Sequence, residues 1–137
     1  MSEIKTVGVV GCGTMGAGIA IVCARAGFRT RVFDLRQDAL DRAREQTRVF
    51  LERSVKKGKL PPDAPGRILE GWQGTTALTD LADCDLVIEA VFEDLGAKHR
   101  IFEQLHAVCA PHAIFASNTS TISVSYTHLT LPTILLV

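Results

Sequence analysis

Three glycines near the start of the chain constrain its fold more than any other feature. Gly11, Gly13 and Gly16 form a G-x-G-x-x-G pattern. The first glycine lets a strand turn sharply, the second lets the backbone approach a pyrophosphate, and the third lets a following helix pack against a sheet. A helix beginning near Thr14 and Met15 would direct its unpaired N–H groups and positive dipole end at that phosphate. The motif therefore predicts a dinucleotide-binding turn.

The residues around the glycines favour this interpretation over a glycine turn that binds nothing. Residues 7–10 are apolar and predict a buried strand, residues 17–22 predict a buried helix, and residues 31–34 predict a second strand that closes a βαβ unit. Asp34 follows Gly13 by 21 residues, where a carboxylate can accept hydrogen bonds from the adenosine ribose hydroxyls. A carboxylate there favours NAD, although the nearby Arg36 could meet a 2′-phosphate, so NADP is less expected than NAD but stays open.

Length and charge exclude several classes of function. The chain has 137 residues, enough for one domain, and its 15 basic and 15 acidic residues cancel, which gives no electrostatic case for a nucleic-acid or membrane partner. The four cysteines have no metal-ligand spacing, so we expect no metal and a reduced, cytoplasmic location. The start of the chain leaves no room for a signal peptide, and its apolar runs are too short to span a bilayer.

Strands and helices alternate along the rest of the chain. We expect helices over 37–57, 61–71 and 95–110, and strands near 75–78, 85–90 and 113–116. The first two helices form a hairpin-like excursion, in which the buried stripe of the longer helix would comprise Leu40, Ala43, Thr47, Phe50, Leu51 and Val55, and Gly58 would end that helix. The pattern predicts an α/β fold with a Rossmann-type, doubly wound parallel sheet.

Three loops should meet at one edge of this sheet, because ligands of open α/β sheets lie at the carboxyl ends of the strands. They follow Val10, Ala90 and Ala116, and the last two carry polar residues at 91–94 and 117–120. We expect Ala90 to contact the cofactor and chemistry to occur where these loops converge.

With these loops in place, the chain resembles the NAD-binding domain of the 3-hydroxyacyl-CoA dehydrogenases. The matching stretches are G-C-G-T-M-G-A-G-I-A (11–20), V-K-K-G-K-L (55–60), D-L-V-I-E-A-V-F-E-D (85–94), Lys98 and A-S-N-T-S-T-I-S (116–123). The resemblance covers nearly all of residues 4–123. It implies oxidation of a (3S)-hydroxyacyl-CoA to a 3-ketoacyl-CoA in β-oxidation of fatty or aromatic acids, with hydride passing to NAD and a histidine taking the hydroxyl proton.

The resemblance also implies roles for single residues. Glu93 and Lys98 would lie along the nicotinamide side of the cofactor. Ser120 would hydrogen-bond the 3-oxygen of the substrate beside the catalytic histidine, and Asn118 would lie close to substrate and cofactor. Lys57 would meet the phosphates of coenzyme A, although Phe50 stands where the family usually has a serine. Taken singly, these residues also fit a solvated loop, a helix-entry acid and exposed bases.

The family's catalytic histidine, its partner glutamate and a C-terminal helical domain are not found in the chain. Residues 124–133 instead match the translation of GTC TCT TAT ACA CAT CTG ACG CTG CCG ACG, a transposon-end sequencing adapter. We therefore expect an NAD-binding domain over 1–123, truncated, followed by an artefactual tail over 124–137. The last family strand, at Ile114 and Phe115, would be left at an unpaired edge, and this chain would bind NAD weakly if at all and be inactive. In the full-length protein we expect a homodimer.

Two other functions stay open. A 6-phosphogluconate-type β-hydroxyacid dehydrogenase shares the G-x-G-x-M-G start, although the loops carrying Glu93 and Ser120 disfavour it. A non-catalytic dinucleotide-binding module is the alternative outside enzymes, because the fold alone does not determine function.

Overall fold

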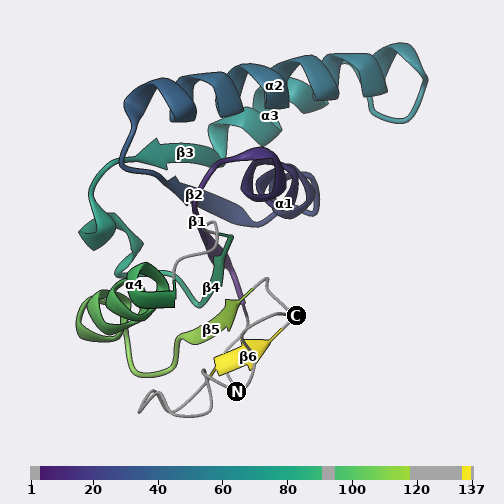
Figure 1. Cartoon of the computed structure of the whole chain (residues 1–137). Helices are drawn as coiled ribbons and strands as arrows, with labels where there is room; N and C mark the ends of the chain where they lie inside the picture. Colours follow the sequence, from purple (N-terminus) through teal and green to yellow (C-terminus); the bar gives the residue numbers. More distant parts are fainter. Residues whose placement is uncertain (1–3, 91–94, 118–133, 137) are drawn as a thin grey trace.

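The computed structural model describes residues 4–90, 95–117 and 134–136. Within them, six parallel strands form one sheet in the order β3-β2-β1-β4-β5-β6 (Figure 1). The strands are β1 (Thr6–Val10), β2 (Arg29–Phe33), β3 (Trp72–Thr75), β4 (Leu86–Glu89), β5 (Ile114–Ser117) and β6 (Ile134–Leu136). The helices are α1 (Thr14–Arg25), α2 (Gln37–Lys56), α3 (Ala64–Glu70) and α4 (Leu95–Val108), with a short 3-10 helix, η1 (Leu78–Leu81).

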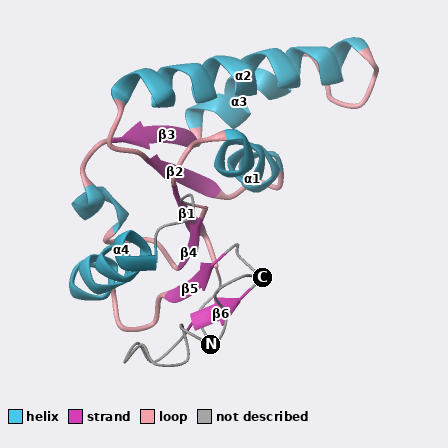
Figure 2. Cartoon of the chain, in the orientation of Figure 1, coloured by secondary structure: helices cyan, strands magenta, loops and turns pink. Residues whose placement is uncertain are grey.

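The sheet is doubly wound, as the sequence predicted. Val9 and Val32 face a core that contains side chains of α1 and α2, whereas their neighbours Val10 and Phe33 face a second core with η1 and α4. Alternate side chains of a strand point to opposite faces, so the strand pattern produces both cores. Figure 2 shows α1 and α4 on opposite sides of the sheet. The strand order reverses between β1 and β4, the position at which such sheets bind nucleotides.

Helix α1 is buried along one face only, which corrects the expectation of a buried helix over 17–22. Ala17, Ala20 and Ala24 pack on the sheet, whereas Val22 is 67% exposed. A helix on the outside of a sheet has a face turned away from it, so apolar residues beyond the stripe at i, i+3 and i+7 remain in solvent.

The α2–α3 excursion is confirmed, with one correction to its buried stripe. Phe50 is 41% exposed, and Ser54 is buried on the packed face instead, its hydroxyl donating to the Phe50 carbonyl at 3.1 Å. Gly58 has φ +74°, a left-handed conformation that suits the residue after a helix C-cap.

Strand β3 lies three residues earlier than the sequence predicted. Trp72 is buried and pairs with Thr30, and the strand ends at Thr75. The Thr75 hydroxyl accepts a hydrogen bond from the Ala77 N–H at 3.0 Å, a local turn that leads into η1. The threonines that indicated a strand therefore belong partly to a turn.

The expected unpaired edge at Ile114 and Phe115 is wrong. Strand β6 pairs with β5 in parallel, with Phe115 opposite Ile134 and Ser117 opposite Leu136. An open strand edge presents unsatisfied N–H and C=O groups, and an apolar segment of the same chain can satisfy them.

Candidate cofactor-binding site

The turn after β1 has the geometry that its glycines predict. Gly11 has φ +95°, and its N–H donates to the Phe33 carbonyl at 2.8 Å, which ties the turn to the end of β2. A Cβ on Gly16 would lie 1.7 Å from the Gly11 carbonyl oxygen. No side chain can be accommodated there, so Gly16 is required for α1 to pack against the turn.

Gly13 leaves the N-terminus of α1 open. A Cβ there would meet no described atom within 4 Å, and the backbone, at φ −64° and ψ −170°, is allowed for any residue. Gly13 has no side chain to cap the helix, and the first turn of α1 contains no acidic residue. The positive end of the α1 dipole is therefore not neutralised by a side chain of this turn. Thr14 and Met15 are exposed here. Packing within the protein does not demand a glycine at position 13, whereas close approach of an anionic group does.

Asp34 is held facing this turn by hydrogen bonds from two backbone amides. Its Oδ2 accepts from the Cys12 N–H at 3.1 Å, and its Oδ1 accepts from the Arg36 N–H at 3.0 Å. The Cys12 thiol also donates to Oδ2 at 3.4 Å. Burial, followed by this hydrogen bond, raises the pKa of Cys12 to about 12, so the thiol stays protonated and remains a donor. The predicted ribose carboxylate is thus oriented before any ligand arrives.

Three residues at the carboxyl ends of the strands were given no individual role from the sequence. Leu35, directly after Asp34, is 82% exposed, which is unusual for a leucine and places an apolar surface next to the predicted ribose-binding carboxylate. Glu89 and Ser117 are both fully buried, and the Ser117 hydroxyl donates to Glu89 Oε1 at 2.7 Å. This pair joins the carboxyl ends of β4 and β5, immediately before Ala90 and the predicted 118–120 loop.

The remaining predicted site residues are placed only in part. The Ala90 N–H donates to the Val10 carbonyl at 2.8 Å, so Ala90 lies beside the end of β1 as expected. Glu93, Asn118 and Ser120 lie outside the described residues, and Lys98 belongs to α4 without a described side chain.

Lys57 lies far from the glycine turn. It is exposed and caps the C-terminus of α2, a helix of 20 residues that starts beside Arg36. At 1.5 Å per residue, the helix separates its two ends by about 30 Å. Figure 1 shows this end of α2 projecting beyond the sheet. Any role for Lys57 therefore concerns a ligand other than the adenosine half of the cofactor.

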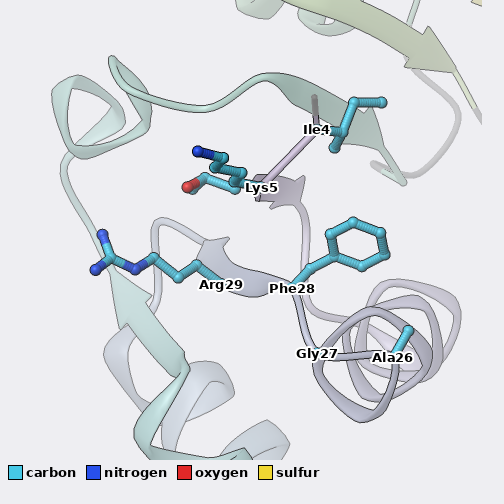
Figure 3. A pocket seen from close by; sticks show the side chains of 7 residues that line it. Ile4, Lys5, Ala26, Gly27, Phe28 and Arg29 are labelled. Carbon is cyan, nitrogen blue, oxygen red and sulfur yellow. The ribbon is translucent and has the colours of Figure 1, made fainter. Parts of the chain in front are cut away.

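A surface hollow lies at the amino ends of β1 and β2, whereas the glycine turn follows the carboxyl end of β1. It is lined by the starts of β1 and β2 and by the end of α1, including Ile4, Lys5, Phe28 and Arg29. Lys5 and Arg29 extend to one side and Phe28 to the other (Figure 3). None of the predicted site residues contributes to this hollow.

The part of the chain that the structure describes contains no cluster of three or more His, Cys, Asp or Glu residues that could hold a metal ion. Its four cysteines are free. No helix among the described residues is long and apolar enough to cross a membrane.

The comparison with known protein families decides the family. Residues 6–131 match the model of the 3-hydroxyacyl-CoA dehydrogenase NAD-binding domain. The chain belongs to the 3-hydroxyacyl-CoA dehydrogenase family. NAD is the cofactor of this domain, and the glycine turn and the Asp34 carboxylate described above are compatible with it.

Individual relatives agree with this assignment. A probable 3-hydroxybutyryl-CoA dehydrogenase of Deinococcus radiodurans is 45% identical over 118 residues, which are 86% of this chain and 42% of the relative. The 3-hydroxyadipyl-CoA dehydrogenase of Escherichia coli is 41% identical over 125 residues, 91% of this chain and 26% of the relative. The crystal structure of Mycobacterium tuberculosis FadB2 superposes with a TM-score of 0.89 at 40% identity, covering 98% of this chain and 49% of that one.

The dehydrogenase relatives are more than twice as long as the stretch they share with this chain. The chain spans 42% and 26% of the two curated relatives named above. What it shares with them is the NAD-binding part.

Proposed function

We propose that this chain is the cofactor-binding part of an NAD-dependent 3-hydroxyacyl-CoA dehydrogenase that oxidises (3S)-hydroxyacyl-CoA to 3-ketoacyl-CoA. The observation that supports this most is the placement of Asp34, whose carboxylate is held against the Cys12 N–H beside the open N-terminus of α1. One element would bind the ribose and the other the pyrophosphate of the same nucleotide. When bound, NAD would supply the hydride acceptor.

The chain's own residues would bind and orient this cofactor. Asp34 would accept hydrogen bonds from the adenosine ribose, and Leu35 would cover one face of the adenine with apolar surface. The Gly13 backbone and the first turn of α1 would donate to the pyrophosphate. Ala90, Glu93 and Lys98 would lie towards the nicotinamide.

Ser120 and Asn118 would act on the substrate side. We propose that Ser120 donates a hydrogen bond to the 3-oxygen of the substrate, with Asn118 close to both substrate and cofactor. The buried Glu89–Ser117 hydrogen bond supports this, since it ties Ser117, the last residue of β5 and the neighbour of Asn118 in the chain, to the end of β4. The proton acceptor, a histidine, would come from the part of the protein beyond this chain.

Lys57 would contact the phosphates of coenzyme A. Its place about 30 Å along α2 from the ribose end suits a long substrate that approaches the cofactor from elsewhere. The names of the relatives suggest 3-hydroxybutyryl-CoA or 3-hydroxyadipyl-CoA as substrates. We further propose that the whole protein is a cytoplasmic homodimer, which light scattering and cell fractionation would test.

We also propose that residues 1–123 are the authentic domain and that 124–137 are an adapter-derived tail, so that this chain binds NAD weakly if at all and does not turn over. Resequencing the source DNA across codons 115–140 without a transposon library tests the tail. A frame that continues past Ser123 into a histidine-containing segment would support it. Confirmed codons for 124–137 followed by a stop would contradict it.

The activity is tested on the full-length gene product by following NADH formation from (3S)-3-hydroxybutyryl-CoA, with 6-phosphogluconate as the control substrate. We expect NADH only with the CoA thioester. Turnover of 6-phosphogluconate alone would favour the other dehydrogenase class, and NAD binding without turnover of either would favour a non-catalytic module.

A further inference from the structure

A compact group of charges borders the ribose position. Asp38 Oδ2 lies 2.7 Å from Arg36 Nη2 and 3.2 Å from Arg42 Nη1, and Asp38 Oδ1 accepts from Arg36 Nε at 3.3 Å. One carboxylate therefore holds two guanidinium groups. All three side chains are more than half exposed.

The Arg36–Asp38–Arg42 group lies next to the predicted ribose-binding carboxylate, Asp34. The backbone N–H of Arg36 is one of the two amide donors to Asp34. Arg42 and Asp38 both lie near enough to Cys12, inside the glycine turn, to affect the pKa of its thiol, which Arg42 lowers and Asp38 raises. With Asp34 included, two carboxylates balance two guanidinium groups beside the ribose.

We propose that Asp38 is a second determinant of cofactor choice, which disfavours NADP by neutralising Arg36 and Arg42 beside the position of a 2′-phosphate. The inference rests on the proposed NAD-binding function. Arginine is the side chain best suited to bind a phosphate, because its planar guanidinium can donate two hydrogen bonds at once. Two arginines at this position would ordinarily favour NADP, and Asp38 cancels that preference.

Asp34 and Asp38 act in different ways. Asp34 occupies the N–H donors of Cys12 and Arg36 and repels a 2′-phosphate directly. Asp38 neutralises the cations that would attract it. Because the Asp38 ion pairs are exposed, they act mainly through charge balance, and their effect should fade as salt screens the charges.

The experiment measures NAD and NADP affinities of the full-length gene product by calorimetry at low salt. Asp38→Asn should lower the NAD-to-NADP affinity ratio by about tenfold, the effect of removing one charge at an assumed ~6 Å from a doubly charged phosphate in water. Asp41→Asn is the matched control, since Asp41 is the next acidic residue of α2 and contacts Gln37 rather than an arginine. It should leave the ratio within about twofold of wild type.

Adding Arg36→Ala and Arg42→Ala to Asp38→Asn should raise the ratio to the wild-type value or above it, because both cations that would attract a 2′-phosphate are then gone. High salt should remove the effect of Asp38→Asn. A ratio that Asp38→Asn and Asp41→Asn change equally would overturn the inference while leaving NAD binding intact. Failure of the wild-type protein to bind NAD would overturn the proposed function and this inference together. Asp38→Ser, which keeps a good residue for a helix N-terminus, replaces Asp38→Asn if that variant is unstable.

Discussion

Glu89 and Ser117 are fully buried side chains that join the ends of β4 and β5. A buried polar group that loses its hydrogen-bond partner lowers the stability of the protein by the desolvation cost of that group. Replacing the partner with a side chain of the same shape that can still accept a hydrogen bond preserves most of the interaction. The pair therefore has a structural role that can be measured separately from any effect on catalysis.

We expect Glu89→Ala to lower the free energy of unfolding by about 1–3 kcal/mol, because it leaves the Ser117 hydroxyl without its acceptor inside the sheet. Glu89→Gln keeps an acceptor of the same shape and should cost less. Urea denaturation of both variants measures this. Glu52→Ala, at an exposed position of α2, serves as a control expected within about 0.5 kcal/mol of wild type. Equal stability of Glu89→Ala and wild type would contradict this role.

Single residues differ in how far the sequence predicts them. Asp34 could be found because the distance from the glycines to the end of the second strand is set by the βαβ unit. Glu89 could not, because its partner is 28 residues away and their contact depends on the register of β4 with β5. The exposure of Leu35 could not be predicted either, because it depends on β2 ending at Phe33, two residues earlier.

At the scale of elements, α1 depends on small residues where it meets the glycine turn. Gly16→Ala would place a Cβ 1.7 Å from the Gly11 carbonyl oxygen, so the helix or the turn must move. We expect a loss of at least about 2 kcal/mol in unfolding free energy and a weakened NAD affinity. Thermal denaturation and NAD titration measure the two effects.

Gly18→Ala is the matched control for this prediction. It lies in the same helix, and its added Cβ would meet no described atom within 4 Å. Alanine is a better helix former than glycine by about 1 kcal/mol, so this variant should be more stable than wild type. A Gly16→Ala protein as stable as Gly18→Ala would show that the close contact at the turn does not exist.

Elements with a regular pattern were predicted well, and those with local turns were not. The apolar spacing of α2 predicted residues 37–57, and the helix spans Gln37–Lys56. The prediction placed β3 too late in the chain because Thr75 and Thr76 are β-branched residues, which favour strands. In the structure, the Thr75 hydroxyl forms hydrogen bonds within a turn. The single buried face of α1 was missed because its sequence is apolar all round.

At the scale of the molecule, Asp85 joins three separate segments. Its Oδ2 accepts hydrogen bonds from the N–H groups of Lys5 and Thr6 at 2.9 and 3.0 Å, and His112 Nε2 lies 2.8 Å from its Oδ1. The Lys5 bond, followed by those of His112 and Thr6, lowers the pKa of Asp85 to about 2 from 3.8.

A folded-state pKa below the unfolded value means that Asp85 contributes stability above about pH 4 and loses it as the pH falls towards about 2. We expect Asp85→Asn to be less stable than wild type at neutral pH and the difference to shrink over this window. Urea unfolding between pH 2 and 5 measures this difference. Asp83→Asn is the control, since the exposed Asp83 carboxylate pairs with Arg31. Parallel loss of stability in Asp85→Asn and wild type would contradict the prediction.

The alternation of strands and helices predicted the doubly wound sheet, but it did not predict the edge strand β6. The βαβ unit and the later strand pattern predicted a doubly wound parallel sheet, and the strand order agrees. Strand β6 was not predicted, because its pairing with β5 joins segments whose association no local pattern encodes.

The nucleotide site is tested by titrating the full-length gene product, labelled with ¹⁵N, with NAD. Amide resonances are followed by NMR. We expect shifts concentrated at Gly11–Gly16 and at Asp34 to Arg36, and their loss in Asp34→Ala. Shifts confined to the hollow around Lys5 and Arg29, or an Asp34→Ala variant that responds like wild type, would show that NAD does not bind at the glycine turn.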